Sequence, residues 1–139
     1  MTPEIALINA IRTRLKNDAA VVAFVGQNVF DQIPEATKPP YIYIGPAGRS
    51  HIVQDCYQIW VQRLRIYVIY TSWNRTEVWE ASEAVVQSLY EIELDLADPF
   101  AAEEPLNVIQ AGDNVDPNAP KSVFIDVQTT ITRALSPAT

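Results

Sequence analysis

The longest strand pattern in the chain is YQIWVQRLRIYVIY, at residues 57–70. Aromatic and β-branched residues dominate it, as is typical of β-strands. Alternate side chains of a strand point to opposite faces, so Leu64, Ile66 and Val68 share a face that we expect to lie in the core. Arg63 and Arg65 then lie together on the opposite face. The pattern is long for a small domain, so we expect its first half to project beyond the body.

Shorter strand patterns surround this one. They fall at residues 28–30, 41–44, 106–109 and 123–131. The segment 45–56 reads as a long connection, because Gly45-Pro46-Ala47-Gly48 combines residues that end strands.

Two main helices are predicted, one at each side of the long strand in sequence. Thr2 is a suitable N-cap for the first, with Pro3 at its first position and an apolar face of Ile5, Ile8, Ile11 and Leu15. Asp18 caps a short helical turn over residues 19–25, which Gly26 ends. Asn74-Arg75-Thr76-Glu77 has the form of a capping box, and the helix after it carries Val78, Ala81, Ser82, Val85 and Leu89 on one face.

The order of these elements is helix, strands, helix, strands. Short connections favour antiparallel pairing, so the sequence predicts an α+β fold with one mostly antiparallel sheet of about four to five strands packed against two main helices. The chain has 139 residues, which suits one domain. We expect that domain to span residues 1–135, with residues 136–139 as a short C-terminal tail.

Composition excludes several classes of function. A net charge of −7 argues against a compact DNA-binding module, which usually carries a basic face. Apolar residues make up 48% of the chain, enough for a real core, and no apolar run is long enough to span a membrane. The first residues lack the basic start and apolar run of a secretory signal. We therefore expect a soluble, intracellular protein.

The charge is unevenly distributed along the chain. Residues 77–120 contain eleven Asp and Glu residues and no Lys or Arg, whereas residues 1–76 carry a net positive charge. Subunits with separated charges can associate head to tail, the positive side of one against the negative side of the next. The simpler interpretation is that the acidic run is a solvated helix end and loop.

The chain offers little for catalysis or metal binding. His51 is its only histidine and lies in a predicted loop without an oxyanion motif, and Cys56 is its only cysteine. Neither a phosphate-binding loop nor a complete calcium loop is present, although Asp113-Asn114-Val115-Asp116 resembles the start of one. Arg63 and Arg65 suit phosphate, but salt bridges to a neighbouring strand or subunit are the favoured interpretation. We expect no cofactor and no enzyme activity.

Two motifs carry a resemblance to a known family. VGQNVFDQIP stands at residues 25–34 and PPYIYIG at residues 39–45, before the long strand and a capped helix. This order resembles the tail completion family (tail terminator, head–tail joining) of long-tailed bacteriophages, also present in gene transfer agents. The long acidic segment 91–104 and the three tryptophans at 60, 73 and 79 depart from the family pattern.

The resemblance implies a virion structural protein without cofactor or catalysis. Such proteins form rings, commonly hexamers, that complete the tail tube and join it to the head connector. The implied partners are other copies of the chain, a tail tube protein on one side and a head–tail connector or stopper protein on the other. The implied location is the head–tail interface of the virion tail, after assembly in the host cytoplasm.

Within such a ring we expect two groups of residues to matter. The predicted subunit-interface residues are Arg49, His51, Arg63 and Arg65, and the predicted channel-facing acidic residues are Glu91, Glu93 and Asp95. Acidic side chains along a channel would repel DNA phosphates, so DNA would pass without specific binding. Two other hypotheses stay open, a small non-catalytic protein-binding adaptor that uses the Arg63 and Arg65 face, and a small hydrolase that uses His51 or a carboxylate pair.

Overall fold

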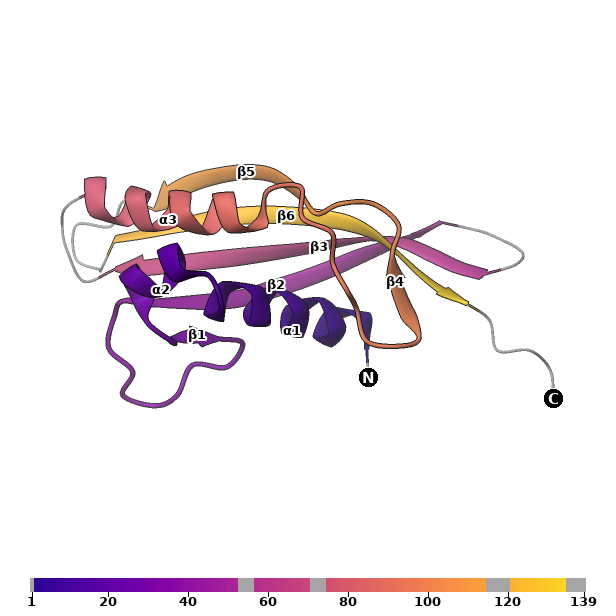
Figure 1. Cartoon of the computed structure of the whole chain (residues 1–139), viewed down its shortest axis with the longest axis horizontal. Helices are drawn as coiled ribbons and strands as arrows, with labels where there is room; N and C mark the ends of the chain where they lie inside the picture. Colours follow the sequence, from indigo (N-terminus) through magenta and orange to yellow (C-terminus); the bar gives the residue numbers. More distant parts are fainter. Residues whose placement is uncertain (1, 53–56, 71–74, 115–120, 135–139) are drawn as a thin grey trace.

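The structure is a computed structural model, and it describes residues 2–52, 57–70, 75–114 and 121–134. Its elements follow in the order α1 (Pro3–Lys16), α2 (Ala19–Val25), β1 (Val29–Phe30), β2 (Tyr41–Ile52), β3 (Tyr57–Tyr70), α3 (Arg75–Leu89), β4 (Phe100–Ala102), β5 (Asn107–Asn114) and β6 (Lys121–Ala134). The helices lie on one side of a long, twisted sheet (Figure 1). Cys56, Asn74 and residues 136–139, which carry earlier predictions, lie outside the described residues.

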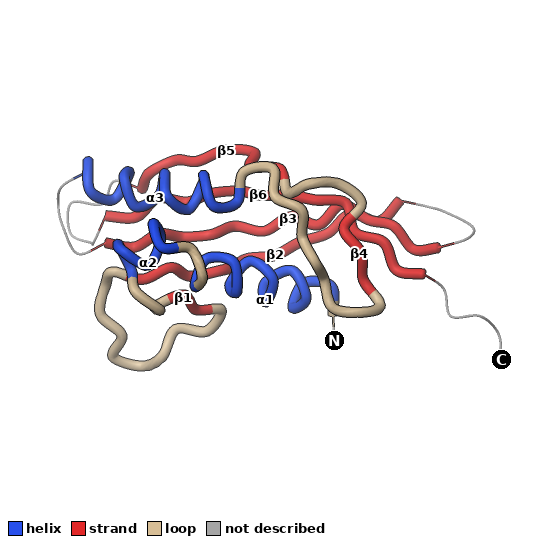
Figure 2. Tube along the Cα trace, in the orientation of Figure 1, coloured by secondary structure: helices blue, strands red, loops and turns tan. Residues whose placement is uncertain are grey.

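The sheet has six strands in the order β1-β2-β3-β6, with β4 and β5 pairing consecutive stretches of the far edge of β6. All pairs are antiparallel except β1 with β2. The predicted α+β class is therefore confirmed, but the sheet is mixed and has six strands rather than four or five. It lies beside the two main helices, α1 and α3, and the short α2, which matches the predicted helical turn over residues 19–25 (Figure 2). The one unpredicted strand among the described residues is β4, whose three residues are too few to show a periodic pattern.

The core lies between the sheet and the helices. On β3, Leu64, Ile66 and Val68 are buried, as the alternation predicts, and the buried side chains of β6 are at odd positions from Val123 to Ile131. Helix α3 contributes Val78, Ala81, Val85 and Leu89 to the same cluster.

The caps at Thr2 and Asp18 are as predicted, and Ile8, Ile11 and Leu15 of the predicted apolar face of α1 are buried. Ile5 donates its backbone N–H to Thr2 Oγ1 at 3.3 Å, and Ala20 donates to Asp18 Oδ1 at 2.9 Å. However, Ile5 is 42% exposed, and the buried stripe runs through Leu7, Ile11 and Leu15. Spacing alone allows either stripe, because Leu7 and Ile8 are both apolar; the position of the sheet selects the one centred on Leu7.

The predicted connection 45–56 is wrong over residues 45–52, and residues 53–56 lie outside the described part of the chain. β2 continues without a break to Ile52, through a β-bulge in which Gly45 and Pro46 lie opposite the single residue Arg65. A bulge inserts one residue into a strand and so reverses which face the following side chains occupy. The residues that predicted a turn therefore form a bulge, because β3 beside them is long enough to pair with the whole segment.

Candidate assembly surface

Three strands continue past the helices and form an arm. We define the arm as residues 47–52 of β2, 57–62 of β3 and 129–134 of β6, which remain paired to their ends. It extends from the body at the end where β4 lies (Figure 1). Every residue from Pro46 to Ile52 is exposed. The expectation that the first half of the long strand projects is thus met, with β2 and β6 beside it.

The base of the arm is organised around Trp60. Its ring is buried and meets the ring of Phe100 edge to face, with 6.1 Å between the centroids. Its indole N–H donates to Gln62 Oε1 at 3.1 Å, and Gln62 Nε2 donates to the Gly48 carbonyl at 3.0 Å. Gln62 is completely buried, and each of these two hydrogen bonds satisfies a polar group that would otherwise be costly to bury. These contacts connect β2, β3 and β4 at one point.

Arg49 and His51 lie on the same face of the arm as Trp60. They pair in register with Gln62 and Trp60 respectively. The guanidinium carbon of Arg49 lies 5.5 Å from the centroid of the Trp60 ring, and its Nε is 3.4 Å from the carboxylate of Glu4. The centroid of the His51 ring lies 5.4 Å from the centroid of the Trp60 ring. His51 thus packs on a tryptophan, and no carboxylate that the structure describes hydrogen-bonds to it, so the described residues give no support to the hydrolase hypothesis.

Arg63 and Arg65 lie on the opposite face, which the helices leave open. Arg63 donates to Ser50 Oγ at 2.9 Å. Arg65 makes two hydrogen bonds to the carboxylate of Asp126, of 2.7 and 3.0 Å, and its guanidinium lies 4.4 Å from the centroid of the Phe124 ring. The four residues predicted for a subunit interface are therefore divided between two faces of the sheet. Sequence could not divide them in this way, because the bulge in β2 sets the face of Arg49 and His51.

The Arg65–Asp126 pair affects the protonation of both groups. Hydrogen bonds from Arg65, supported by one from Gln110, lower the pKa of Asp126, and the bonds to Asp126 raise the pKa of Arg65. Both groups are thus charged at neutral pH. A salt bridge to a neighbouring strand was the favoured interpretation of Arg65, and the structure confirms it for this residue.

A hollow lies over the open face at the level of this pair. It has a volume of about 430 Å³, and its lining includes Arg63, Arg65, Gln110, Asp126 and Gln128. Two bulges flank it, one at Gly45 and Pro46 on β2 and one at Ile109 on β5. Bulges bend and twist a strand, so both borders of the hollow lie where the sheet is most distorted.

The open face also carries aromatic side chains that the sequence interpretation did not single out. Tyr43 and Tyr67 stack, with 6.4 Å between the centroids of their rings. The Phe124 ring lies against Gly112, where an added Cβ would approach to 2.7 Å. The sequence could have predicted this surface, because Tyr41, Tyr43 and Tyr67 alternate with aliphatic residues that are buried in the structure.

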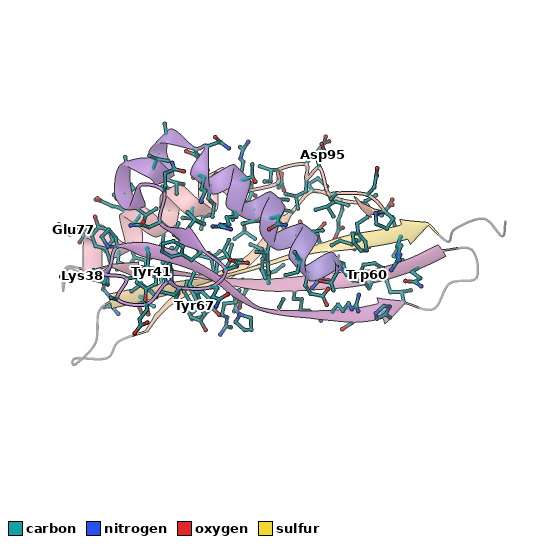
Figure 3. The ribbon with its side chains drawn as sticks, turned by 90° about the horizontal axis from the view of Figure 1, so that it is seen from below. Lys38, Tyr41, Trp60, Tyr67, Glu77 and Asp95 are labelled. Atoms are coloured by element: carbon teal, nitrogen blue, oxygen red, sulfur yellow. The ribbon has the colours of Figure 1, made fainter. Side chains whose placement is uncertain are left out.

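The predicted channel-facing acids lie in the segment that follows α3. Glu91, Glu93 and Asp95 are exposed, whereas Leu96 between them and β4 is buried. Hydrogen bonds from Glu91 N to the Leu106 carbonyl, and from Leu106 N to the Ile92 carbonyl, attach the segment to the chain before β5. Glu93 and Asp95 border a groove of about 440 Å³ against α1. Asp95 lies on the helix side, away from Tyr67 on the open face (Figure 3).

The described residues hold no group of three His, Cys, Asp or Glu side chains arranged to bind a metal ion. In that same part of the chain, no helix combines the length and apolar character needed to cross a membrane.

Comparisons with known proteins bear on these surfaces. No curated protein matches the chain significantly. A chain in the solved structure of the virion of a native gene transfer agent particle is 22% identical and superimposes with a TM-score of 0.83, over 91% of this chain and 95% of the other. At that identity the likeness shows a shared fold. The family model for tail completion protein gp17 matches residues 9–132. Because that match covers most of the chain, the chain belongs to the tail completion protein gp17 family and is a structural protein of the virion tail.

Proposed function

We propose that copies of this chain form a closed ring, of six copies as the family resemblance implies, that completes the tail tube and joins it to the head connector. DNA passes through the ring without specific binding. The tail tube protein lies on one side of the ring and the connector or stopper protein on the other.

The observation that carries the proposal is the arm. The β2 part of the arm adds no buried side chain to the domain's own core, because residues 46–52 remain exposed. Such an extension gains buried surface when it meets another chain. Contacts between different surfaces of identical chains close into rings when the rotation between neighbours permits it. The positive charges of Arg49 and Arg63 on or beside the arm suit contact with an acidic neighbour.

The acidic segment supports an open channel. No Lys or Arg side chain in the described residues forms a salt bridge with Glu91, Glu93 or Asp95. Facing the lumen, these carboxylates would repel the phosphates of DNA and prevent the counterion release that makes basic channels bind it. The genome could then slide past them.

The alternative is a small protein-binding adaptor without a ring. The hollow beside Arg63 and the aromatic open face give such an adaptor a surface for a partner. The two functions differ in the mass of the assembly at the end of the tail tube. A ring contains several copies per tail, whereas an adaptor can act as a single copy.

The decisive experiment removes the protein from particles during their assembly. Electron micrographs should show filled heads separated from tails, or tails of uncontrolled length, and the wild-type gene supplied in trans should restore complete particles. Complete, infectious or transducing particles without the protein would contradict the proposal.

A further inference from the structure

The sheet has two free edges among the described residues. On one side, β1 pairs only with Ile42 and Tyr43 of β2, so β2 has no partner strand along residues 47–52 except β3. On the other side, β5 pairs only with β6. A free strand edge presents unpaired N–H and C=O groups and is a template for pairing with another chain.

Proline, which blocks pairing at many strand edges, is absent from the segment of each edge that would pair. Residues 47–52 contain no proline, and Pro46 and the bulge lie just before them. Residues 110–114 also contain no proline, and the bulge at Ile109 lies before them. Ile109 is 53% exposed and Ile52 is 44% exposed, so each edge has an apolar side chain directed away from the core.

The directions of the strands suit a contact between the two edges. β2 is antiparallel to β3, β3 to β6 and β6 to β5, so β2 and β5 run in opposite directions. Rotation about an axis that runs along the strands leaves these directions unchanged. The β5 edge of one copy therefore meets the β2 edge of the next as an antiparallel pair, the arrangement that a short ladder favours.

The charges of the two edges are complementary. Residues 47–52 contain Arg49, which also reaches Glu4 of its own chain, and no acidic residue. Residues 100–114, which form the β4 and β5 edge, contain Glu103 and Glu104, together with Asp113, which pairs with Arg75 of its own chain, and no Lys or Arg. Opposite charges across a contact favour the correct pairing of edges and oppose the pairing of like edges.

We propose that neighbouring copies join by pairing residues 47–52 of β2 in one copy with β5 of the next, which makes one continuous sheet around the ring. This inference rests on the ring proposed above and assigns its contact. Residues 110–114 lie level with residues 41–46 of their own sheet. Neighbours are thus displaced along the strands by about six residues, roughly 20 Å. A closed sheet of tilted strands requires a displacement of this kind.

Disulfide trapping in assembled particles tests the contact. In a Cys56→Ser background, Ser50→Cys on β2 is combined in turn with Ile109→Cys, Gln110→Cys or Ala111→Cys on β5. Opposite residues of an antiparallel pair have Cα atoms about 4.5–5.5 Å apart, within reach of a disulfide. After mild oxidation, at least one combination should give a ladder of covalent multimers on a non-reducing gel, because every copy carries both edges.

The controls separate this contact from others. Ser50→Cys combined with Gln87→Cys, on the exposed face of α3, should give no ladder. Dimers from Ser50→Cys alone would mean that β2 edges pair with each other, and a covalent product with a different tail protein would mean that the edge binds that protein; either result overturns the proposal.

The proposed ring and its proposed contact fail in different ways. If complete particles contain the variants in several copies per tail and no combination gives a ladder, the edge contact is wrong and the ring stands. If complete particles lack the protein, both proposals fall.

Discussion

Arg65 and Asp126 pair across β3 and β6 at the level where both borders of the sheet bulge. Gly45 and Pro46 bulge on the Arg65 side, and Ile109 bulges on the Asp126 side. The two-pronged pair, with bonds of 2.7 and 3.0 Å, spans the floor of the hollow between these distortions. Bidentate guanidinium–carboxylate bonds fix geometry as well as charge. The pair therefore fixes the two central strands where the outer strands depart from regular pairing.

The first prediction concerns acid stability. The hydrogen bonds from Arg65 lower the pKa of Asp126, and those from Arg75 and Trp79 lower the pKa of Asp113. A carboxyl group whose pKa is lower in the folded chain than in the unfolded chain stabilises the fold at pH values above its unfolded pKa. This stabilisation is lost as the pH falls through the pKa of the folded state. The melting temperature should be level above about pH 5 and fall below pH 4. Asp126→Asn should be less stable at pH 7 and show a shallower fall in thermal melts; an equal slope would contradict the assignment.

The second prediction concerns Trp60 at the base of the arm. Trp60→Ala should lower the free energy of unfolding by about 3–5 kcal/mol, because it leaves a cavity in the core. Trp60→Phe keeps a ring but removes the indole N–H, so the buried Gln62 Oε1 loses its donor at a cost of about 1–3 kcal/mol. Urea unfolding measures both. Tyr90→Ala, at a 56% exposed site, is the control and should change stability by less than about 0.5 kcal/mol.

The third prediction separates assembly from folding on the open face. Arg63 bonds to Ser50 and forms no salt bridge within the described residues, so Arg63→Glu should leave the melting temperature nearly unchanged and reduce incorporation into particles. Arg65→Glu places two carboxylates together and should lower the melting temperature. Melting curves and immunoblots of particles check both. If Arg63→Glu unfolds the protein, Arg63 supports the fold rather than the interface.

The fourth prediction concerns the channel. Changing Glu91, Glu93 and Asp95 together to Lys should slow the release of DNA from assembled particles, because cations at the lumen bind phosphate, and raised salt should restore the rate. Fluorescent dye entering or binding released DNA follows the kinetics. The matched control changes Glu77, Glu80 and Glu83 of α3 to Lys, an equal change of charge elsewhere. Equal slowing in both variants would place the effect outside the channel.

Much of the fold follows from local patterns in the sequence. The alternation over β3 predicts its buried face and the side of Arg63 and Arg65, and the caps at Thr2 and Asp18 place two helix starts. These features depend on neighbours a few residues apart, which is why sequence reveals them. Ile5 shows the limit, because the choice between two apolar stripes on α1 depends on where the sheet lies.

The candidate surface was less predictable. Arg49, His51, Arg63 and Arg65 were grouped because they are cations near one strand, but they divide between two faces. The division follows from the Gly45–Pro46 bulge, which exists because β2 pairs with a distant strand. The same residues taken alone indicate a turn. Pairing between strands that are far apart in the sequence decides between the bulge and the turn. The local sequence at Gly45–Pro46 does not show which distant strand pairs there.

The single extra residue at Gly45–Pro46 sets the phase of everything beyond it on β2. Ile42 and Ile44 face the helices, and after the bulge Arg49 and His51 do so in place of Gly48 and Ser50. Deleting one residue there would exchange the faces that the side chains of residues 47–52 occupy, while the buried side chains of Ile42 and Ile44 kept their places. The bulge therefore separates the part of β2 that can contact a neighbouring copy from the part that packs in the core. A change in the length of the chain at this point would alter which side chains the neighbour meets without altering the core.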